Sequence, residues 1–163
     1  MNKILFIGAG NMAYAIACGI SRAKLVDDAN IILYDKNEAQ FEKFPSTFSK
    51  ASDLNKAISE ADYIFFSVKP QNIKDVLAEI KVNIEEKIFI SICAGVTMES
   101  IEKNFDKIKL IRTMPNTPLL IGQGVTALCK NQYVNDDEFE FVKSIFASCG
   151  IVDFTNGNIN CFC

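Results

Sequence analysis

The chain has 163 residues, of which 49% are hydrophobic, and a formal net charge of −3 at pH 7. Its length suits one domain with its own core, and the lack of a basic cluster or a long apolar run argues against nucleic-acid partners and membrane spans, so we expect a cytoplasmic location. Histidine is absent, which excludes Ser–His and Cys–His nucleophilic pairs and histidine-ligated zinc.

The six cysteines match neither a disulfide framework nor a zinc site. Four of them lie in apolar, helix-like or strand-like surroundings, where cysteine acts as a small hydrophobe: Cys18, Cys93, Cys129 and Cys149. Cys161 and Cys163 close the chain, and two ligands do not complete a metal site. We therefore predict no metal and an oxidation-prone tail.

Short apolar runs alternate with amphipathic segments along the chain. The apolar runs predict strands at residues 3–7, 31–34, 63–67, 87–92, 109–113, 125–129 and 151–154. The amphipathic segments predict helices at residues 12–23, 38–44, 54–61, 73–80, 98–105 and 136–148. This alternation predicts an α/β fold with a doubly wound, Rossmann-type, mostly parallel sheet over residues 1–154. Residues 155–163 are polar and turn-rich, and predict a short irregular tail.

The first apolar run leads directly into a glycine motif, Gly8-Ala9-Gly10-Asn11-Met12-Ala13. A glycine turn after a first strand lets the backbone approach a pyrophosphate, and the following helix points its free N–H groups at that anion. Because a strand precedes the motif and a helix follows it, we predict that these six residues bind a dinucleotide.

The second predicted strand ends in Asp35-Lys36-Asn37. An acidic residue at this position would accept a hydrogen bond from the adenosine ribose 2′-hydroxyl, which favours NAD. Lys36 and Asn37 would instead suit the 2′-phosphate of NADP. The two signals conflict, and these residues alone leave the cofactor preference open.

Three later strand ends carry further candidate residues. Val68-Lys69-Pro70 follows the third strand, and Lys69 is placed to meet phosphate, ribose or a carboxylate. The small residues Ala94-Gly95-Val96 follow the next strand and would let a flat nicotinamide ring approach the backbone. Met114-Pro115-Asn116 begins a stiff, proline-bracketed loop that suits a site wall.

Together these segments resemble the pyrroline-5-carboxylate reductases. The matching motifs, in order, are residues 7–13, Val68-Lys69-Pro70, Ala94-Gly95-Val96-Thr97 and Met114-Pro115-Asn116-Thr117-Pro118. The resemblance covers residues 1–154, and the last motif is more specific than the glycine motif.

The resemblance implies reduction of 1-pyrroline-5-carboxylate to L-proline by hydride transfer from NADPH or NADH, with a modest preference for NADPH despite Asp35. By resemblance, Gly8 to Ala13 bind the pyrophosphate and residues 34–37 the adenosine ribose. The segments 68–70 and 94–97 would line the nicotinamide half, with 114–116 near nicotinamide and substrate. No catalytic residue is assigned, although Lys69 and Asn116 are candidates beside the nicotinamide.

The sequence departs from this family after residue 154. Family members continue into a C-terminal helical domain that makes an interwoven dimer and contacts the substrate, and residues 156–163 stand where it should begin. We therefore expect that domain to be absent and this chain to be monomeric, although the family is homo-oligomeric. The alternatives are an inactive NAD(P)-binding module left by truncation and, less favoured, another NAD(P)-binding oxidoreductase such as an F420-dependent NADP reductase.

Overall fold

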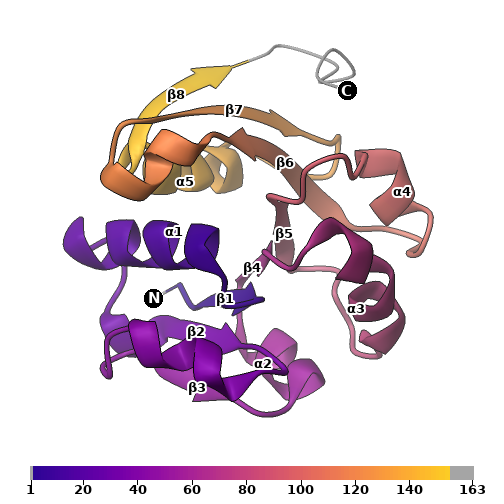
Figure 1. Ribbon diagram of the computed structural model, residues 1–163. Helices are drawn as coiled ribbons and strands as arrows, with labels where there is room; N and C mark the ends of the chain where they lie inside the picture. Colours follow the sequence, from indigo (N-terminus) through magenta and orange to yellow (C-terminus); the bar gives the residue numbers. More distant parts are fainter. Residues whose placement is uncertain (1, 155–163) are drawn as a thin grey trace.

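The computed structural model describes residues 2–154, which form one eight-stranded sheet with helices on both faces (Figure 1). The strands are β1 (Ile4–Ile7), β2 (Ile31–Tyr34), β3 (Ser49–Ala51), β4 (Tyr63–Phe66), β5 (Ile88–Ser91), β6 (Lys109–Pro115), β7 (Gly124–Lys130) and β8 (Gly150–Phe154). The α-helices are α1 (Asn11–Arg22), α2 (Leu54–Glu60), α3 (Ile73–Glu79), α4 (Met98–Glu102) and α5 (Asp136–Ala147). Short 3₁₀ helices are η1 (Asp28–Asn30), η2 (Glu38–Lys43), η3 (Pro70–Asn72) and η4 (Thr117–Ile121).

The strand order is β3-β2-β1-β4-β5-β6-β7-β8, and the first six strands in this order are parallel. β7 runs antiparallel to β6, and β8 runs parallel to β7. The predicted doubly wound, mostly parallel sheet is confirmed. After β1 the chain moves to β2 on one side and returns to β4 on the other, so a topological switch point lies at the carboxyl end of β1.

Three local predictions were wrong. Residues 38–44 do not form an α-helix but the 3₁₀ helix η2, in which Phe41 is the buried residue, so no apolar stripe sustains a longer helix. β3 was not predicted because it has three residues and no apolar run. Met114 and Pro115, predicted to begin a loop, belong to β6, because β7 pairs with them.

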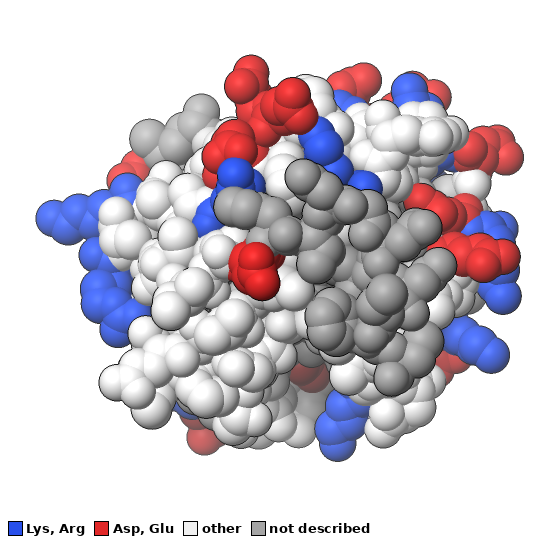
Figure 2. All heavy atoms as spheres, turned by 90° about the horizontal axis from the view of Figure 1, so that it is seen from above, with Lys and Arg blue, Asp and Glu red and all other residues white. Residues whose placement is uncertain are grey.

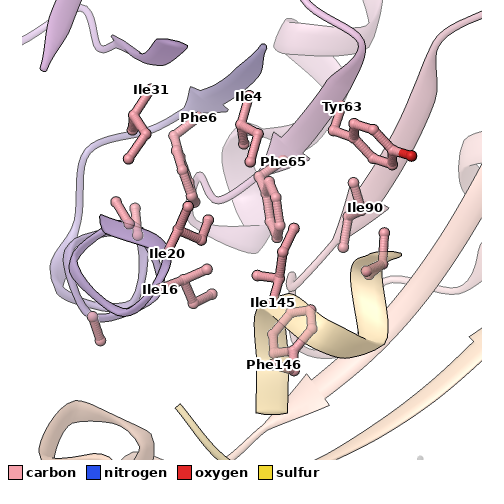
Figure 3. Close-up of a cluster of buried hydrophobic side chains, with 14 of the residues drawn as sticks. Ile4, Phe6, Ile16, Ile20, Ile31, Tyr63, Phe65, Ile90, Ile145 and Phe146 are labelled. Atoms are coloured by element: carbon pink, nitrogen blue, oxygen red, sulfur yellow. The ribbon is translucent and has the colours of Figure 1, made fainter. Parts of the chain in front are cut away.

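The core has one layer on each face of the sheet. On one face, α1 and α5 pack against β1 and β4, where the rings of Phe6 and Phe65 stack with centroids 4.6 Å apart (Figure 3). On the other face, α2, α3 and α4 cover the alternate residues, including Leu5 and Phe66. Because both faces are covered, all four residues of β1 are buried, which explains its continuous apolar run.

The surface is not dominated by one sign of charge. On the face seen from above, acidic and basic side chains are both present among the described residues, and one acidic side chain lies near the middle (Figure 2). Within residues 2–154, none of the helices has the length and hydropathy that a membrane crossing requires.

Candidate functional site

A pocket of about 410 Å³ opens at the carboxyl ends of β1, β2 and β4, beside the switch point. Its volume lies in the range of small-molecule sites, and open α/β sheets bind ligands at this edge. The pocket is lined by Ile7, Gly8, Gly10, Tyr34, Asp35, Lys36, Asn37, Gln40, Ser67, Val68, Lys69, Asn72, Asp75 and Val76.

Gly8 brings the turn after β1 against the end of β4. Its φ is +100°, and a Cβ atom there would lie 2.7 Å from backbone atoms of Ser67 and Val68. The Ser67 hydroxyl lies within hydrogen-bond distance of the carbonyl oxygens of Ile7 and Gly8, at 3.0 and 2.8 Å. This contact requires glycine and holds the floor of the pocket.

Gly10 leaves the N-terminus of α1 open towards the pocket. It is the N-cap residue of α1, in an extended conformation, and no side chain caps the helix. A Cβ atom on Gly10 would meet no heavy atom within 4 Å. The first N–H groups of α1 and its positive dipole end therefore face a space where an anion fits. These features fit the pyrophosphate of a dinucleotide.

Asp35 ties the glycine turn to the end of β2. One carboxylate oxygen accepts the N–H of Ala9 and the other accepts the N–H of Asn37, both at 2.8 Å. Ala9 was predicted to contact the cofactor, but its N–H is used here and its side chain is buried. Asp35 thus fixes the turn, and its carboxylate oxygens keep further lone pairs for a ligand hydroxyl.

Lys36 reaches across the pocket to α3. Its ammonium forms an ion pair with the carboxylate of Glu79. The hydrogen bond and charge of Glu79 raise the pKa of Lys36, with smaller contributions from Tyr34 and Asp75. The lysine is thus engaged with an acidic partner at the rim of the pocket.

The pocket gathers seven of the predicted site residues. These seven are Gly8, Gly10, Asp35, Lys36, Asn37, Val68 and Lys69. Five others from the same segments are not part of the lining: Ala9, Asn11, Met12, Ala13 and Pro70. Ala13 is fully buried in the core, so only its backbone can face a ligand.

The other six predicted residues lie after β5 and at the end of β6, at the same edge of the sheet but outside the pocket lining. Ala94 and Gly95 are exposed there, whereas Val96 is buried. The side-chain oxygen of Asn116 accepts the N–H of Val125 at 2.9 Å, so this side chain is held in place by β7. The segment from Met114 to Asn116 therefore forms a fixed wall.

Several lining residues were not predicted, including Gln40, Asn72, Asp75 and Val76. Asp75 and Val76 lie in the first turn of α3. A signal existed for them, because a helix that follows a parallel strand begins at the carboxyl edge of the sheet. Gln40 had no such signal, because its position depends on the 3₁₀ conformation of η2.

Cys93 supports the site without being placed to react. Its thiol lies 3.5 and 3.3 Å from the carbonyl oxygens of Phe66 and Val68, so it links the ends of β4 and β5. Burial raises the pKa of this thiol to about 11. A protonated, buried thiol is a structural group at neutral pH.

Over residues 2–154, the side chains of His, Cys, Asp and Glu form no cluster that would hold a metal ion. The predicted tail, with Cys161 and Cys163, lies outside the described residues.

Comparison with known proteins places the chain in a family. Residues 3–95, which contain the whole pocket, match the family model described as NADP oxidoreductase, coenzyme F420-dependent. The chain belongs to this family. The predicted resemblance to pyrroline-5-carboxylate reductases is also confirmed, because similarity to them extends far beyond residue 95.

Two curated relatives illustrate this similarity. The pyrroline-5-carboxylate reductase of Escherichia coli (strain K12) is 35% identical over 155 residues, which are 91% of this chain and 56% of that protein. The enzyme of the same name from Synechocystis sp. is 33% identical over 148 residues, 90% of this chain and 55% of that protein. The chain thus spans slightly more than half the length of these relatives.

Solved structures agree in fold. The pyrroline carboxylate reductase of Plasmodium falciparum with NADP bound has a TM-score of 0.84 and 33% identity, and the match covers 95% of this chain and 58% of that one. The Coxiella burnetii pyrroline-5-carboxylate reductase has a TM-score of 0.88 and 30% identity, covering 96% and 60%. A reductive aminase from Aspergillus terreus, at 14% identity and a TM-score of 0.74, shares the fold.

Proposed function

We propose that the pocket binds NADPH or NADH, and that residues 1–154 supply the dinucleotide-binding domain of a pyrroline-5-carboxylate reductase. One observation carries the proposal: the uncapped N-terminus of α1 faces open space beside Gly10, inside a pocket at the switch point of the sheet. NADP in the similar P. falciparum enzyme supports the cofactor, and the names of the relatives support the substrate, 1-pyrroline-5-carboxylate.

The residues divide into two groups in this proposal. Backbone N–H groups of Gly10 to Ala13 would hold the pyrophosphate, and Asp35 to Asn37 would surround the adenosine ribose. Residues 68–70, 94–96 and 114–116 would contact the nicotinamide half. When bound, the dinucleotide supplies the hydride. The chain's own residues bind and orient, which requires no histidine and no covalent intermediate.

Lys69 and Asn116 are the residues that we place nearest the reacting groups. Lys69 is exposed at the end of β4 and lines the pocket. The side-chain oxygen of Asn116 is engaged by Val125, so its amide NH₂ is left to donate to a ligand. Both would position the reactants.

Direct titration tests the binding site. The fluorescence of NADH and NADPH should change saturably with the wild-type chain, and Gly10→Val should weaken both by at least about tenfold, or 1.4 kcal/mol. The valine would fill the space in front of α1, while the extended backbone of Gly10 tolerates a side chain. Gly10→Ala, a smaller intrusion, should give an intermediate loss. Unchanged affinity in a folded Gly10→Val protein contradicts the site.

A second candidate function is cofactor binding without turnover. The observation behind it is that the chain spans 54–58% of the length of its first relatives. Oxidation of NADH and NADPH in the presence of 1-pyrroline-5-carboxylate separates the two. Turnover supports the reductase, and binding without turnover supports the second candidate. Replacing the substrate with oxidised coenzyme F420 tests the activity that the family description names.

A further inference from the structure

The end of the pocket beyond β2 carries more acidic than basic groups. Asp35 and Asp75 line it, and Lys36, which also lines it, forms its ion pair with Glu79. Asp75 and Glu79 are four residues apart on α3, and this spacing places both carboxylates on one face of the helix. That face lies across the pocket from the end of β2.

We propose that Glu79, through its ion pair with Lys36, and the nearby charge of Asp75 make this pocket select NADH over NADPH. The inference rests on the proposed function, in which the adenosine ribose lies beside Asp35, and it adds the cofactor preference. It runs against the preference for NADPH that the family resemblance implies.

The two cofactors differ by one phosphate on the adenosine ribose. A phosphate monoester carries a charge of about −1.5 to −2 at pH 7, so it needs cationic partners. Lys36 follows β2 directly, but it would have to leave Glu79 to bind this phosphate. Its departure would leave the carboxylate of Glu79 unpaired close to the phosphate, where like charges repel.

Asp35 adds to the discrimination because it cannot turn away. Its two oxygens each accept a backbone N–H at 2.8 Å, from Ala9 and from Asn37. A ribose hydroxyl can donate to the remaining lone pairs of this carboxylate, whereas a phosphate that is mostly dianionic at pH 7 is repelled by it. The neutral hydroxyl of NADH therefore fits where the phosphate of NADPH does not.

The remaining cation of the lining is Lys69, which follows β4. It comes from the opposite side of the switch point from Asp35 and Lys36. It therefore suits the pyrophosphate or nicotinamide half better than the adenosine 2′ position. This leaves Lys36 as the lysine that decides whether a 2′-phosphate is accepted.

The test compares dissociation constants for NADH and NADPH at low ionic strength, measured by nicotinamide fluorescence. The wild-type chain should bind NADH at least about tenfold more tightly than NADPH, since like charges oppose the phosphate. Glu79→Gln should tighten NADPH about three- to tenfold and change NADH less than about twofold, because it releases Lys36 from an exposed and therefore weak ion pair. Asp75→Asn should act in the same direction.

Two controls identify the cause. Glu85→Gln removes the same charge from an exposed position just before β5, at the amino end of this strand and away from the pocket. It should leave the dissociation constants of NADH and NADPH unchanged. Adding Lys36→Met to Glu79→Gln should abolish the gain in NADPH affinity. Competition by adenosine 2′,5′-bisphosphate against ADP should show the same preferences, since neither probe needs the nicotinamide half.

Equal or tighter binding of NADPH by the wild-type chain overturns the inference while leaving the proposed function intact. So does a Glu79→Gln protein with no gain for NADPH, or a gain that persists after Lys36→Met. Absence of binding by both dinucleotides overturns the proposed function, and the inference with it.

Discussion

Gly8 and Gly10 lie two residues apart in the turn between β1 and α1, but an added side chain would meet different surroundings at each. At Gly8 the φ of +100° and the backbone of Ser67 and Val68, 2.7 Å from a Cβ, exclude every other residue. At Gly10 the Cβ would point into open space. The first glycine serves the fold, and the second serves the proposed ligand.

Gly8→Ala should lower the free energy of unfolding by about 2–4 kcal/mol, since backbone strain and overpacking add. Gly10→Ala, two residues away, should change it by less than about 0.5 kcal/mol. Urea denaturation of the two variants makes the comparison at matched chemistry. Equal stability of the Gly8→Ala and wild-type proteins would show that the turn can move away from β4.

At the level of elements, side chains cap the N-terminus of α5, whereas no side chain caps the N-terminus of α1. The Asn135 side chain accepts the N–H of Glu138 at 2.8 Å, and Glu138 accepts the N–H of Asn135 at 2.9 Å, which is a capping box. The other Glu138 oxygen accepts from Lys109 of β6 at 2.7 Å. This network fixes α5 to the sheet, whereas no side chain caps α1 at the proposed site.

Asn135→Ala should therefore cost about 1 kcal/mol of unfolding free energy, the usual cost of a lost N-cap. Asn135→Ser is the matched control, because a serine hydroxyl can still accept from the backbone, and it should lie within about 0.5 kcal/mol of wild type. Chemical denaturation at neutral pH measures both. A harmless Asn135→Ala would mean that the packing of α5, rather than its cap, determines its stability.

The elements that could be predicted are those whose signal is local. β1 and β4 are continuous apolar runs because helices cover both of their faces, and the glycine motif marks the start of α1. β3 was not predicted because its three residues carry no local strand signal, and its conformation depends on pairing with β2. The contact of Glu79 with Lys36 also depends on the fold, because it joins residues 43 apart and no periodicity in the sequence indicates it.

For the molecule as a whole, the unfolding free energy should depend more on side chains that ionise at high pH than on side chains that ionise near neutral pH. The chain contains no histidine, the side chain that normally titrates near pH 6.5. Burial raises the pKa of Cys93 from 9.0 to about 11 and that of Tyr63 from 10.0 to about 12. At the acidic end, hydrogen bonds from Ser21 and Thr47 lower the pKa of Asp28.

These shifts predict the shape of the stability curve. A side chain whose pKa is higher in the folded than in the unfolded protein contributes its full stabilisation at pH values below its unfolded pKa. This contribution is lost as the pH rises from the unfolded pKa to the folded pKa. The unfolding free energy should therefore stay nearly level between about pH 5 and 8, where none of the side chains with a shifted pKa within residues 2–154 changes its charge. It should fall between pH 9 and about 11 as the unfolded chain releases the Cys93 proton that the folded protein retains. The lowered pKa of Asp28 gives a pH dependence of the opposite sign. Below the ordinary Asp pKa of 3.8, the unfolding free energy should decrease as the pH decreases.

Cys93→Ala isolates one of the two large alkaline contributions. The substitution should lower stability at pH 7, because a buried side chain is truncated. It should also flatten the decline between pH 9 and 11 by about 2 kcal/mol, which is most of the roughly 2.7 kcal/mol that corresponds to a shift of two pKa units. Urea unfolding at pH 7, 9, 10 and 11 separates the change in level from the change in slope. Parallel curves for the variant and the wild type would show that the Cys93 thiol is not what the folded protein keeps protonated, and would leave Tyr63, with its pKa of about 12, as the group to replace next.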